Sequence, residues 1–279
     1  MTAPYGTLAP GWLDRAVIAA TSSLPDNWLG LRLAIGLRRI TKSRLGEDRG
    51  LDVERWGIRM RLHPVRNGCE KNLLFTPQMY EPPERMELAR EIDKAGHSGR
   101  KFVFVDIGAN VGLFSLFVAS YAGSNAEIVA VEPEPTNLGR LHFNVGANHD
   151  LPIRVIGLAL GESTGRVVVE LDKKDRGGTT TRPLGPYDAT DVVTVDCRPL
   201  LEVVKQEGLT HIDALKIDVE GVEDKILVPF FTNAPSDLWP NLVIIEDTRD
   251  RWKSDLFSLL EQIGYRVSSR TKLNVMLRR

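Results

Sequence analysis

The residues whose types and spacing best suit ligand binding lie between positions 106 and 112, directly after the apolar run 102–105. Gly108 and Gly112 lack a Cβ, so the backbone there can turn sharply and lie close to a ligand. Asn110 is of a residue type that tolerates a left-handed backbone. Their G-x-x-x-G spacing differs from the G-x-G-x-x-G spacing that cradles a pyrophosphate. This glycine turn, residues 106–112, therefore predicts a cofactor site of another kind.

Two acidic residues narrow the choice of ligand. Asp106 opens the glycine turn, and an acid there would repel a pyrophosphate but can bind a cationic amino group. Glu132 ends the next apolar run, where a carboxylate can accept hydrogen bonds from both hydroxyls of a ribose. A ligand with a ribose, a cationic amino-acid end and no phosphate is S-adenosylmethionine. One alternative is an NAD-type oxidoreductase, and Asp106 and the glycine spacing count against it. The other is a non-catalytic subunit of the same fold that only binds a partner through its basic N-terminal helix, and the intact cofactor residues argue against it.

Four blocks of sequence resemble the FkbM family of S-adenosylmethionine-dependent methyltransferases, over about residues 75–278. The resemblance implies an O-methyltransferase that acts on a hydroxyl of a sugar, a glycan or a secondary metabolite. It also implies a seven-stranded sheet with an antiparallel final strand. The blocks are Val105-Asp-Ile-Gly-Ala-Asn-Val-Gly112, Val131-Glu-Pro-Glu-Pro135, Ala159-Leu-Gly161 and Leu215-Lys-Ile-Asp-Val-Glu-Gly221.

Acidic residues at the ends of two later apolar runs suggest how an acceptor is activated. Asp218, together with Glu246 and Asp247, resembles the magnesium site of catechol-type O-methyltransferases, although Gly221 occupies the place of the lysine in that pattern. Mg²⁺ prefers such hard oxygen ligands and would lower the pKa of a substrate hydroxyl. The metal-free alternative makes Asp218 or Glu220 the general base.

Two further residues have weaker functional interpretations. Leu160 lies in the block that ends the third expected strand, where backbone groups could meet the edge of an adenine. His63 is the one histidine in a segment that could cap the cleft, and histidine is a common general base. Its alternative is a surface histidine on an accessory strand.

Bulk composition excludes several classes of protein. The 279 residues carry a formal net charge of −1, which argues against a nucleic-acid binder driven by phosphate contacts. Two cysteines do not make a disulfide framework or a cysteine-rich zinc site. The sequence shows no apolar run of transmembrane length and no signal-peptide pattern, so we expect a cytoplasmic enzyme.

Residues 1–50 are expected to form a helical extension, because 13–22 and 28–40 have the apolar spacing of helices. The second helix is basic, which favours a lid, a homodimer contact or attachment to an anionic surface. The alternative is an ordinary solvated face. The apolar spacing predicts these buried positions: Trp12, Trp28, Leu29, Leu33 and Leu37.

Residues 51–100 are expected to be accessory structure that caps the cleft, with short strands in 51–75 and a helix from Glu81-Pro-Pro-Glu84 to about 95. From residue 101, strands and helices alternate, as in a doubly wound, mostly parallel sheet. A polar, glycine-rich insertion at 172–189 follows the first strand of a predicted β-pair, 165–171 with 191–197. The expected central strands are 102–106, 127–132, 153–159, 214–217, 241–246, 265–268 and 273–277. The sequence therefore predicts an α/β, Rossmann-like class I methyltransferase domain over residues 101–279.

Overall fold

A seven-stranded central sheet organises the computed structural model, which describes residues 3–171, 180–183 and 192–279. Neighbouring strands are parallel except around β13, which is antiparallel to both of its neighbours. This arrangement confirms the predicted α/β sheet with an antiparallel final strand. In spatial order the strands are β12 (Arg266–Arg270), β13 (Asn274–Arg278), β11 (Leu242–Glu246), β10 (Ala214–Ile217), β3 (Phe102–Ile107), β4 (Ala126–Val131) and β5 (Ile153–Ile156).

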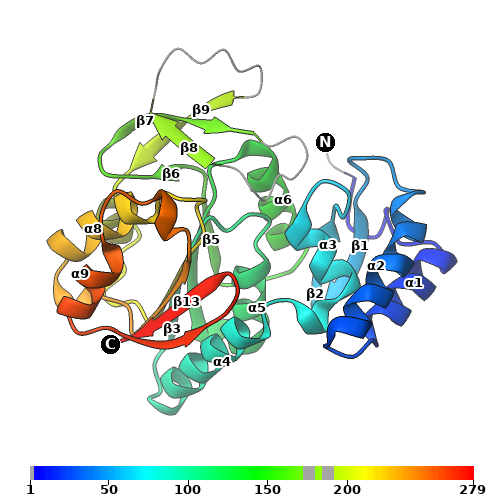
Figure 1. Ribbon diagram of the computed structural model, residues 1–279, viewed down its shortest axis with the longest axis horizontal. Coiled ribbons are helices and arrows are strands. Elements are labelled where there is room, and N and C mark those ends of the chain that lie inside the picture. Colours follow the sequence, from blue (N-terminus) through cyan, green and yellow to red (C-terminus); the bar gives the residue numbers. More distant parts are fainter. Residues whose placement is uncertain (1–2, 172–179, 184–191) are drawn as a thin grey trace.

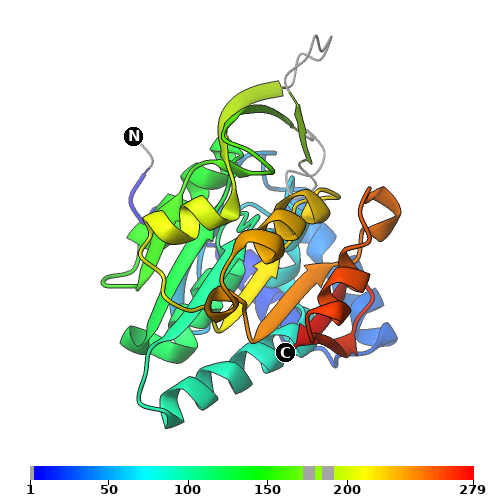
Figure 2. The same cartoon turned by 90° about the vertical axis from the view of Figure 1, so that its left-hand side faces the viewer.

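Helices cover both faces of this sheet (Figures 1 and 2). Side chains alternate between the faces of a strand, so Phe102 and Phe104 pack into one core and Val103 and Val105 into the other. The covering helices are α4 (Pro82–His97), α5 (Leu113–Ala122), α6 (Pro135–Gly146), α7 (Leu200–Gln206), α8 (Glu223–Asn233) and α9 (Leu256–Gln262). The short 3-10 helices are η1 (Pro77–Met79), η2 (Gly123–Asn125), η3 (Ser236–Leu238) and η4 (Arg249–Arg251).

The N-terminal segment forms one end of the molecule, with α1 and α2 outermost (Figure 1). Its core is continuous with the core on the Phe102 face of the sheet, because Val17 of α1 and Leu51 of β1 belong to the same cluster as Phe102. This core crosses both expected domain boundaries, at residues 50 and 100. The elements are α1 (Trp12–Ser22), α2 (Trp28–Lys42), β1 (Leu51–Arg55), β2 (Ile58–Leu62) and α3 (Gly68–Phe75).

The helix α3 corrects the expectation of strands throughout 51–75. Asn67 caps this helix by accepting a hydrogen bond from the Glu70 backbone N–H at 3.0 Å. The strands in this range are β1 and β2, which pair antiparallel. With only eight residues and a side-chain cap at its N-terminus alone, this helix is too short to be identified from the spacing of apolar residues.

The bulky side chains of the N-terminal helices point away from the core, contrary to prediction. Trp12 is 75% exposed and Trp28 is 69% exposed, and Leu29 and Leu33 are also exposed. Of the expected set, only Leu37 packs partly against the core. The inner face of α2 instead carries small residues, because neighbouring backbone lies too close for larger side chains. They are Gly30, Ala34 and Thr41.

Gly30 illustrates this constraint, because a Cβ at that position would lie 2.1 Å from the carbonyl oxygen of Pro25.

Within the described ranges, none of the helices combines the length and apolar character needed to cross a bilayer.

A second, four-stranded sheet lies beyond one end of the central sheet (Figure 2). Antiparallel pairing of β7 with β9 confirms the predicted β-pair. The expected strand 153–159 is wrong at its end: β5 stops at Ile156, and residues 159–160 pair with β9 instead. Of the insertion at 172–189, only β8 lies within the described residues. The strands are β6 (Ala159–Leu160), β9 (Val192–Arg198), β7 (Gly165–Glu170) and β8 (Thr180–Pro183).

Candidate active site

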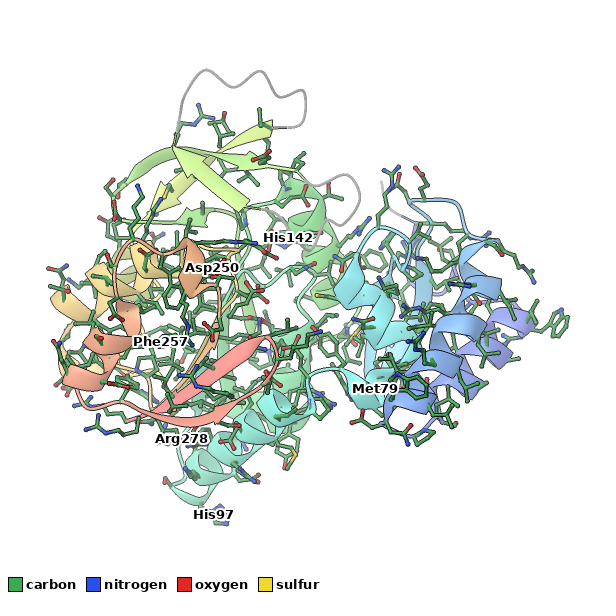
Figure 3. All side chains as sticks on the ribbon, in the orientation of Figure 1. Met79, His97, His142, Asp250, Phe257 and Arg278 are labelled. Carbon is green, nitrogen blue, oxygen red and sulfur yellow. The ribbon has the colours of Figure 1, made fainter. Side chains whose placement is uncertain are left out.

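A cavity of about 670 Å³ opens at the carboxyl ends of β3, β4, β10 and β11. This is the edge where open α/β sheets bind ligands, and the volume suits a cofactor with a small acceptor. Its opposite wall comes from the start of α2 and from the segment between α3 and α4, which includes Met79 (Figure 3). The pocket therefore lies between the central sheet and the N-terminal segment.

The glycine turn forms the floor of this pocket. Gly108 has a φ of +73°, and a Cβ there would lie 1.9 Å from the backbone oxygen of Asp218. Asn110 has a left-handed φ of 53°, and its side-chain oxygen accepts a hydrogen bond from Asn67 at 2.8 Å. Gly112, with a φ of +88°, stands directly before α5. Gly108 and Asn110 line the cavity, whereas Gly112 packs its backbone against Leu141.

Glu132 and Asp106 reach the same cavity from the ends of two adjacent strands. The two carboxylate oxygens of Glu132 accept hydrogen bonds from the backbone N–H groups of Asn110, at 2.7 Å, and Glu134, at 2.9 Å. Burial nevertheless raises the pKa of Glu132 to about 8. Asp106 accepts hydrogen bonds from the backbone and hydroxyl of Ser115, and burial also raises its pKa.

Lys216 lines the pocket, and sequence reasoning assigned it no role. The residue lies in β10, and its ammonium donates to Asp218 at 2.9 Å and sits 4.9 Å from the ring centre of Phe114. Although burial disfavours the ammonium, three neighbouring carboxylates, Asp218 first, outweigh this effect and raise the pKa of Lys216. The available signal was a charged residue inside an apolar strand, because burying an unpaired charge is costly.

Three carboxyl groups converge on the cavity from the ends of β10 and β11. One oxygen each of Asp218, Glu220 and Glu246 lies within 4.8 Å of the others. Burial, followed by repulsion from Asp218 and Glu220, raises the pKa of Glu246 to about 8. Its Oε2 atom is buried and accepts no hydrogen bond from the part of the chain that the structure describes. This arrangement can accept a proton or a hydrogen bond from a bound molecule.

Asp247 does not join this cluster, which corrects the predicted metal set. Its carboxylate forms a two-pronged ion pair with Arg249, with distances of 2.7 and 2.5 Å, and lies 3.5 Å from Arg270. Side chains alternate in direction along a strand, so Glu246 and its neighbour diverge. Glu220 takes the third position instead, because its left-handed backbone, with a φ of 58°, turns the chain toward the pocket.

His63 and Leu160 lie outside the residues that line the pocket. The Nδ1 atom of His63 is 3.3 Å from Glu70, whose other carboxylate oxygen accepts from Arg140 at 2.8 Å. Leu160 is buried in the core on the Val103 face of the central sheet, and its strand pairs it with Arg198. Neither position supports the role that the sequence suggested. His97 lies at the end of α4 and His142 on α6, also away from the pocket lining (Figure 3).

Glu81 is a second residue that sequence reasoning missed. It stands before α4 in a left-handed conformation with a φ of 42°, and its carboxylate accepts from Asn274 at 3.2 Å. Burial raises the pKa of Glu81 to about 7, although the charge of Lys216 opposes this shift. A glutamate directly before two prolines predicts a helix start, and nothing in that pattern reveals that the side chain lines a cavity.

Glu223 holds the loop that presents the acidic cluster. Its buried carboxylate accepts from the backbone N–H groups of Val219 and Gly221, each at 3.2 Å. The other oxygen accepts from Thr248 and from the Trp252 indole, both at 2.7 Å. Glu223 therefore fixes the position of Glu220 between β10 and α8.

The family model described as the methyltransferase FkbM domain matches residues 106–267, which is more than half of the chain. The chain belongs to the FkbM methyltransferase family. This family membership confirms the resemblance in the sequence and makes the chain an S-adenosylmethionine-dependent methyltransferase with a class I fold. The matched range contains the glycine turn, Glu132 and the whole acidic cluster.

Two curated relatives are similar to parts of this FkbM methyltransferase. Methyltransferase sdnD of Sordaria araneosa is 29% identical over 205 residues, which cover 56% of this chain and 79% of that protein. The AMB antimetabolite synthetase AmbE of Pseudomonas aeruginosa is 30% identical over 206 residues, which cover 60% of this chain and 10% of that protein.

Solved methyltransferase structures are similar at low sequence identity. The human methyltransferase 10 domain containing protein is 15% identical with a TM-score of 0.46, covering 87% of this chain and 94% of that one. An S-adenosylmethionine-dependent methyltransferase of Agrobacterium tumefaciens is 14% identical with a TM-score of 0.44, covering 84% and 70%.

Proposed function

We propose that this methyltransferase transfers a methyl group to a hydroxyl oxygen of a small molecule, either a sugar or a secondary metabolite. The observation that carries this proposal is the unpartnered, buried Oε2 atom of Glu246 beside Asp218 and Glu220. An acceptor hydroxyl placed there would supply the missing donor. Similarity to part of an antimetabolite synthetase supports a secondary-metabolite acceptor.

The cofactor side of the pocket would hold S-adenosylmethionine through four residues. Glu132 would accept hydrogen bonds from the ribose hydroxyls, and Asp106 would face the cationic amino group. Gly108 and Asn110 let the backbone approach the ligand closely. When bound, the cofactor supplies an electrophilic methyl carbon on a sulfonium, and the remaining steps belong to the protein.

The acidic cluster would remove the proton of the acceptor hydroxyl. Glu246 is the best general base of the three, because a pKa raised to about 8 makes its ionised form, which predominates above that pH, a stronger base than an ordinary carboxylate. Asp218, held by Lys216, would orient the hydroxyl oxygen in line with the methyl carbon. The oxygen would then be free to bond to the methyl carbon that the cofactor supplies, with the carbon–sulfur bond breaking and S-adenosylhomocysteine as the second product.

The same carboxylates do not favour the magnesium alternative. Lys216 already places a buried positive charge 2.9 Å from Asp218, and a divalent cation beside it would be repelled. We therefore assign the role of Mg²⁺ in neutralising the carboxylates to Lys216, and route no step through a metal.

Cofactor binding is tested by calorimetry with S-adenosylmethionine. We expect the Glu132→Ala variant to bind at least about tenfold more weakly, because hydrogen bonds to a charged group contribute about 1.5–3 kcal/mol each. Glu127→Ala, which removes an exposed acid of the same strand, is the matched control. A native chain that binds NAD⁺ and no S-adenosylmethionine would contradict the assignment.

The proton-transfer role is tested with methyl-tritiated S-adenosylmethionine and a panel of sugars and hydroxylated metabolites. We expect Glu246→Gln to lower kcat by about 10²–10⁴-fold while the affinity for S-adenosylmethionine stays unchanged. Asp247→Asn alters the adjacent acid, which points away from the cluster, and should retain activity. Activity that EDTA abolishes and Mg²⁺ restores would overturn the metal-free scheme.

A further inference from the structure

The outward face of α2 is apolar and basic at the same time. Trp28, Arg32 and Arg39 are spaced four and seven residues apart, so they share the ridge that faces away from the core. Leu29, Leu33 and Ile40 follow the same spacing and form an exposed apolar stripe beside that ridge. Each of these apolar side chains is at least 42% exposed.

This concentration is specific to the N-terminal helices. Of the ten large hydrophobic side chains that are exposed among the described residues, six lie between positions 12 and 40. Isolated exposed hydrophobic side chains are normal on a protein surface, whereas a cluster of this kind marks an interaction site. We call the exposed side chains of α1 and α2 the outer face, which consists of Trp12, Trp28, Leu29, Arg32, Leu33, Arg39 and Ile40.

The charge of α2 indicates the kind of partner. The helix carries Arg32, Arg38, Arg39 and Lys42 and no acidic residue, although the whole chain has a net charge of −1. The Arg32 guanidinium lies 5.3 Å from the centre of the Trp28 ring. Tryptophan, leucine and arginine together suit the headgroup region of a bilayer, which is apolar on one side and anionic on the other.

We propose that the outer face binds the surface of an anionic lipid bilayer, with α2 lying in the plane of the headgroups. Leu31, on a neighbouring face of the same helix, lines the pocket together with Asn27. Membrane attachment would therefore bring the wall of the pocket close to the headgroups. A second copy of the chain is a less suitable partner, because a two-fold interface would place two sets of like charges together.

The proposal is tested by co-sedimentation of the full chain with two kinds of vesicle, phosphatidylcholine alone and phosphatidylcholine with about 30% phosphatidylglycerol. We expect binding to the anionic vesicles, weakened at high salt, and little to the neutral ones. The Leu29→Glu/Leu33→Glu variant should lower the bound fraction on the order of tenfold, because it replaces the apolar stripe with charges that the lipid repels.

The matched control is Met86→Glu/Tyr121→Glu, which adds the same charge at two exposed apolar positions outside the outer face. Calorimetry with S-adenosylmethionine checks that both variants fold and is independent of lipid. Equal binding by the two variants, or equal binding to neutral and anionic vesicles, would overturn the proposal. Light scattering that finds a dimer which Leu29→Glu/Leu33→Glu dissociates would also overturn it, and would assign the face to a second copy.

Discussion

Three side chains of the pocket sit on left-handed backbone, which L-residues other than glycine rarely adopt. Of the five such residues among those described, Glu81, Asn110 and Glu220 line the cavity. Each such conformation costs free energy and persists only where the surroundings enforce it. At these positions the strained backbone directs a polar side chain into the cavity, so the cost in stability falls where side-chain direction matters for binding.

Substitution of Asn110 separates backbone strain from side-chain bonding. Asn110→Ala should lower the free energy of unfolding by about 1–3 kcal/mol, since alanine resists a φ of 53° and the bond from Asn67 is lost. Asn110→Gly loses the same hydrogen bond but accepts the conformation, so it should cost less. Urea unfolding of both variants measures the difference, and equal losses would show that the backbone is not strained.

Glu81 predicts a change of stability with pH. The pKa of its carboxyl is 4.5 in the unfolded chain and about 7 in the folded chain. Between pH 4.5 and pH 7 the folded chain therefore keeps a proton that the unfolded chain releases. The stabilising contribution of this proton is complete below about pH 4.5 and is lost as pH rises toward 7.

Glu81→Gln removes this dependence while keeping an oxygen for Asn274. The free energy of unfolding of the variant, relative to the native chain, should therefore increase from pH 5 to pH 7.5. Urea unfolding at the two pH values measures it. A difference that stays constant with pH would show that Glu81 titrates normally.

At the scale of elements, the sequence predicted those strands and helices that the local spacing of apolar residues determines. The apolar runs located β3, β4, β10 and β11, because a strand buried on both faces consists mostly of apolar residues. The N-terminal helices were also located, but their inward faces were assigned wrongly. Periodicity finds an apolar stripe without saying what covers it, and around Gly30 only small residues fit.

The candidate site was predictable to the same degree. Strand-end position brought Asp106, Glu132 and Asp218 to one pocket, as parallel strands require. The choice between Glu220 and Asp247 depended on a left-handed turn and on an ion pair with arginines, which spacing does not encode. The wall from residues 26–81 was foreseen only as a cap, because distant contacts between segments leave no local pattern.

A buried ion pair joins the two strands of the hairpin β1–β2, and its carboxylate also binds the preceding chain. Asp52 accepts from Arg61 at 2.7 Å and also from the backbone N–H groups of Gly6 and Leu8. Asp52→Ala should therefore lower the free energy of unfolding by about 3–5 kcal/mol, because it leaves the Arg61 guanidinium buried and unpaired.

Asp196→Ala provides the comparison for this pair. It removes an exposed partner of Arg166 at 3.9 Å, and its cost should stay within about 1 kcal/mol. Thermal or urea unfolding of the two variants checks the contrast. Similar losses would show that burial does not distinguish these ion pairs.

At the scale of the whole molecule, one sheet separates two cores that draw their residues from different parts of the sequence. The core on the Phe102 face draws on α1, β1, α3 and α4 as well as the sheet, whereas the other core is built from residues beyond 102. The N-terminal segment is therefore an integral part of one core. The far wall of the pocket comes from this segment, so it is anchored to the same core as the sheet.

The two walls of the pocket come from separate stretches of the chain. The glycine turn and acidic cluster lie within the range shared with the family, 106–267, while much of the facing wall is contributed by residues 26–81, before that range. The two walls can therefore change separately as long as the residues of the early segment that pack into the shared core are kept. A lineage could replace the pocket-facing residues of that segment and acquire a new acceptor while keeping the methyl-transfer machinery, and grafting those residues from a relative would repeat that exchange in the laboratory.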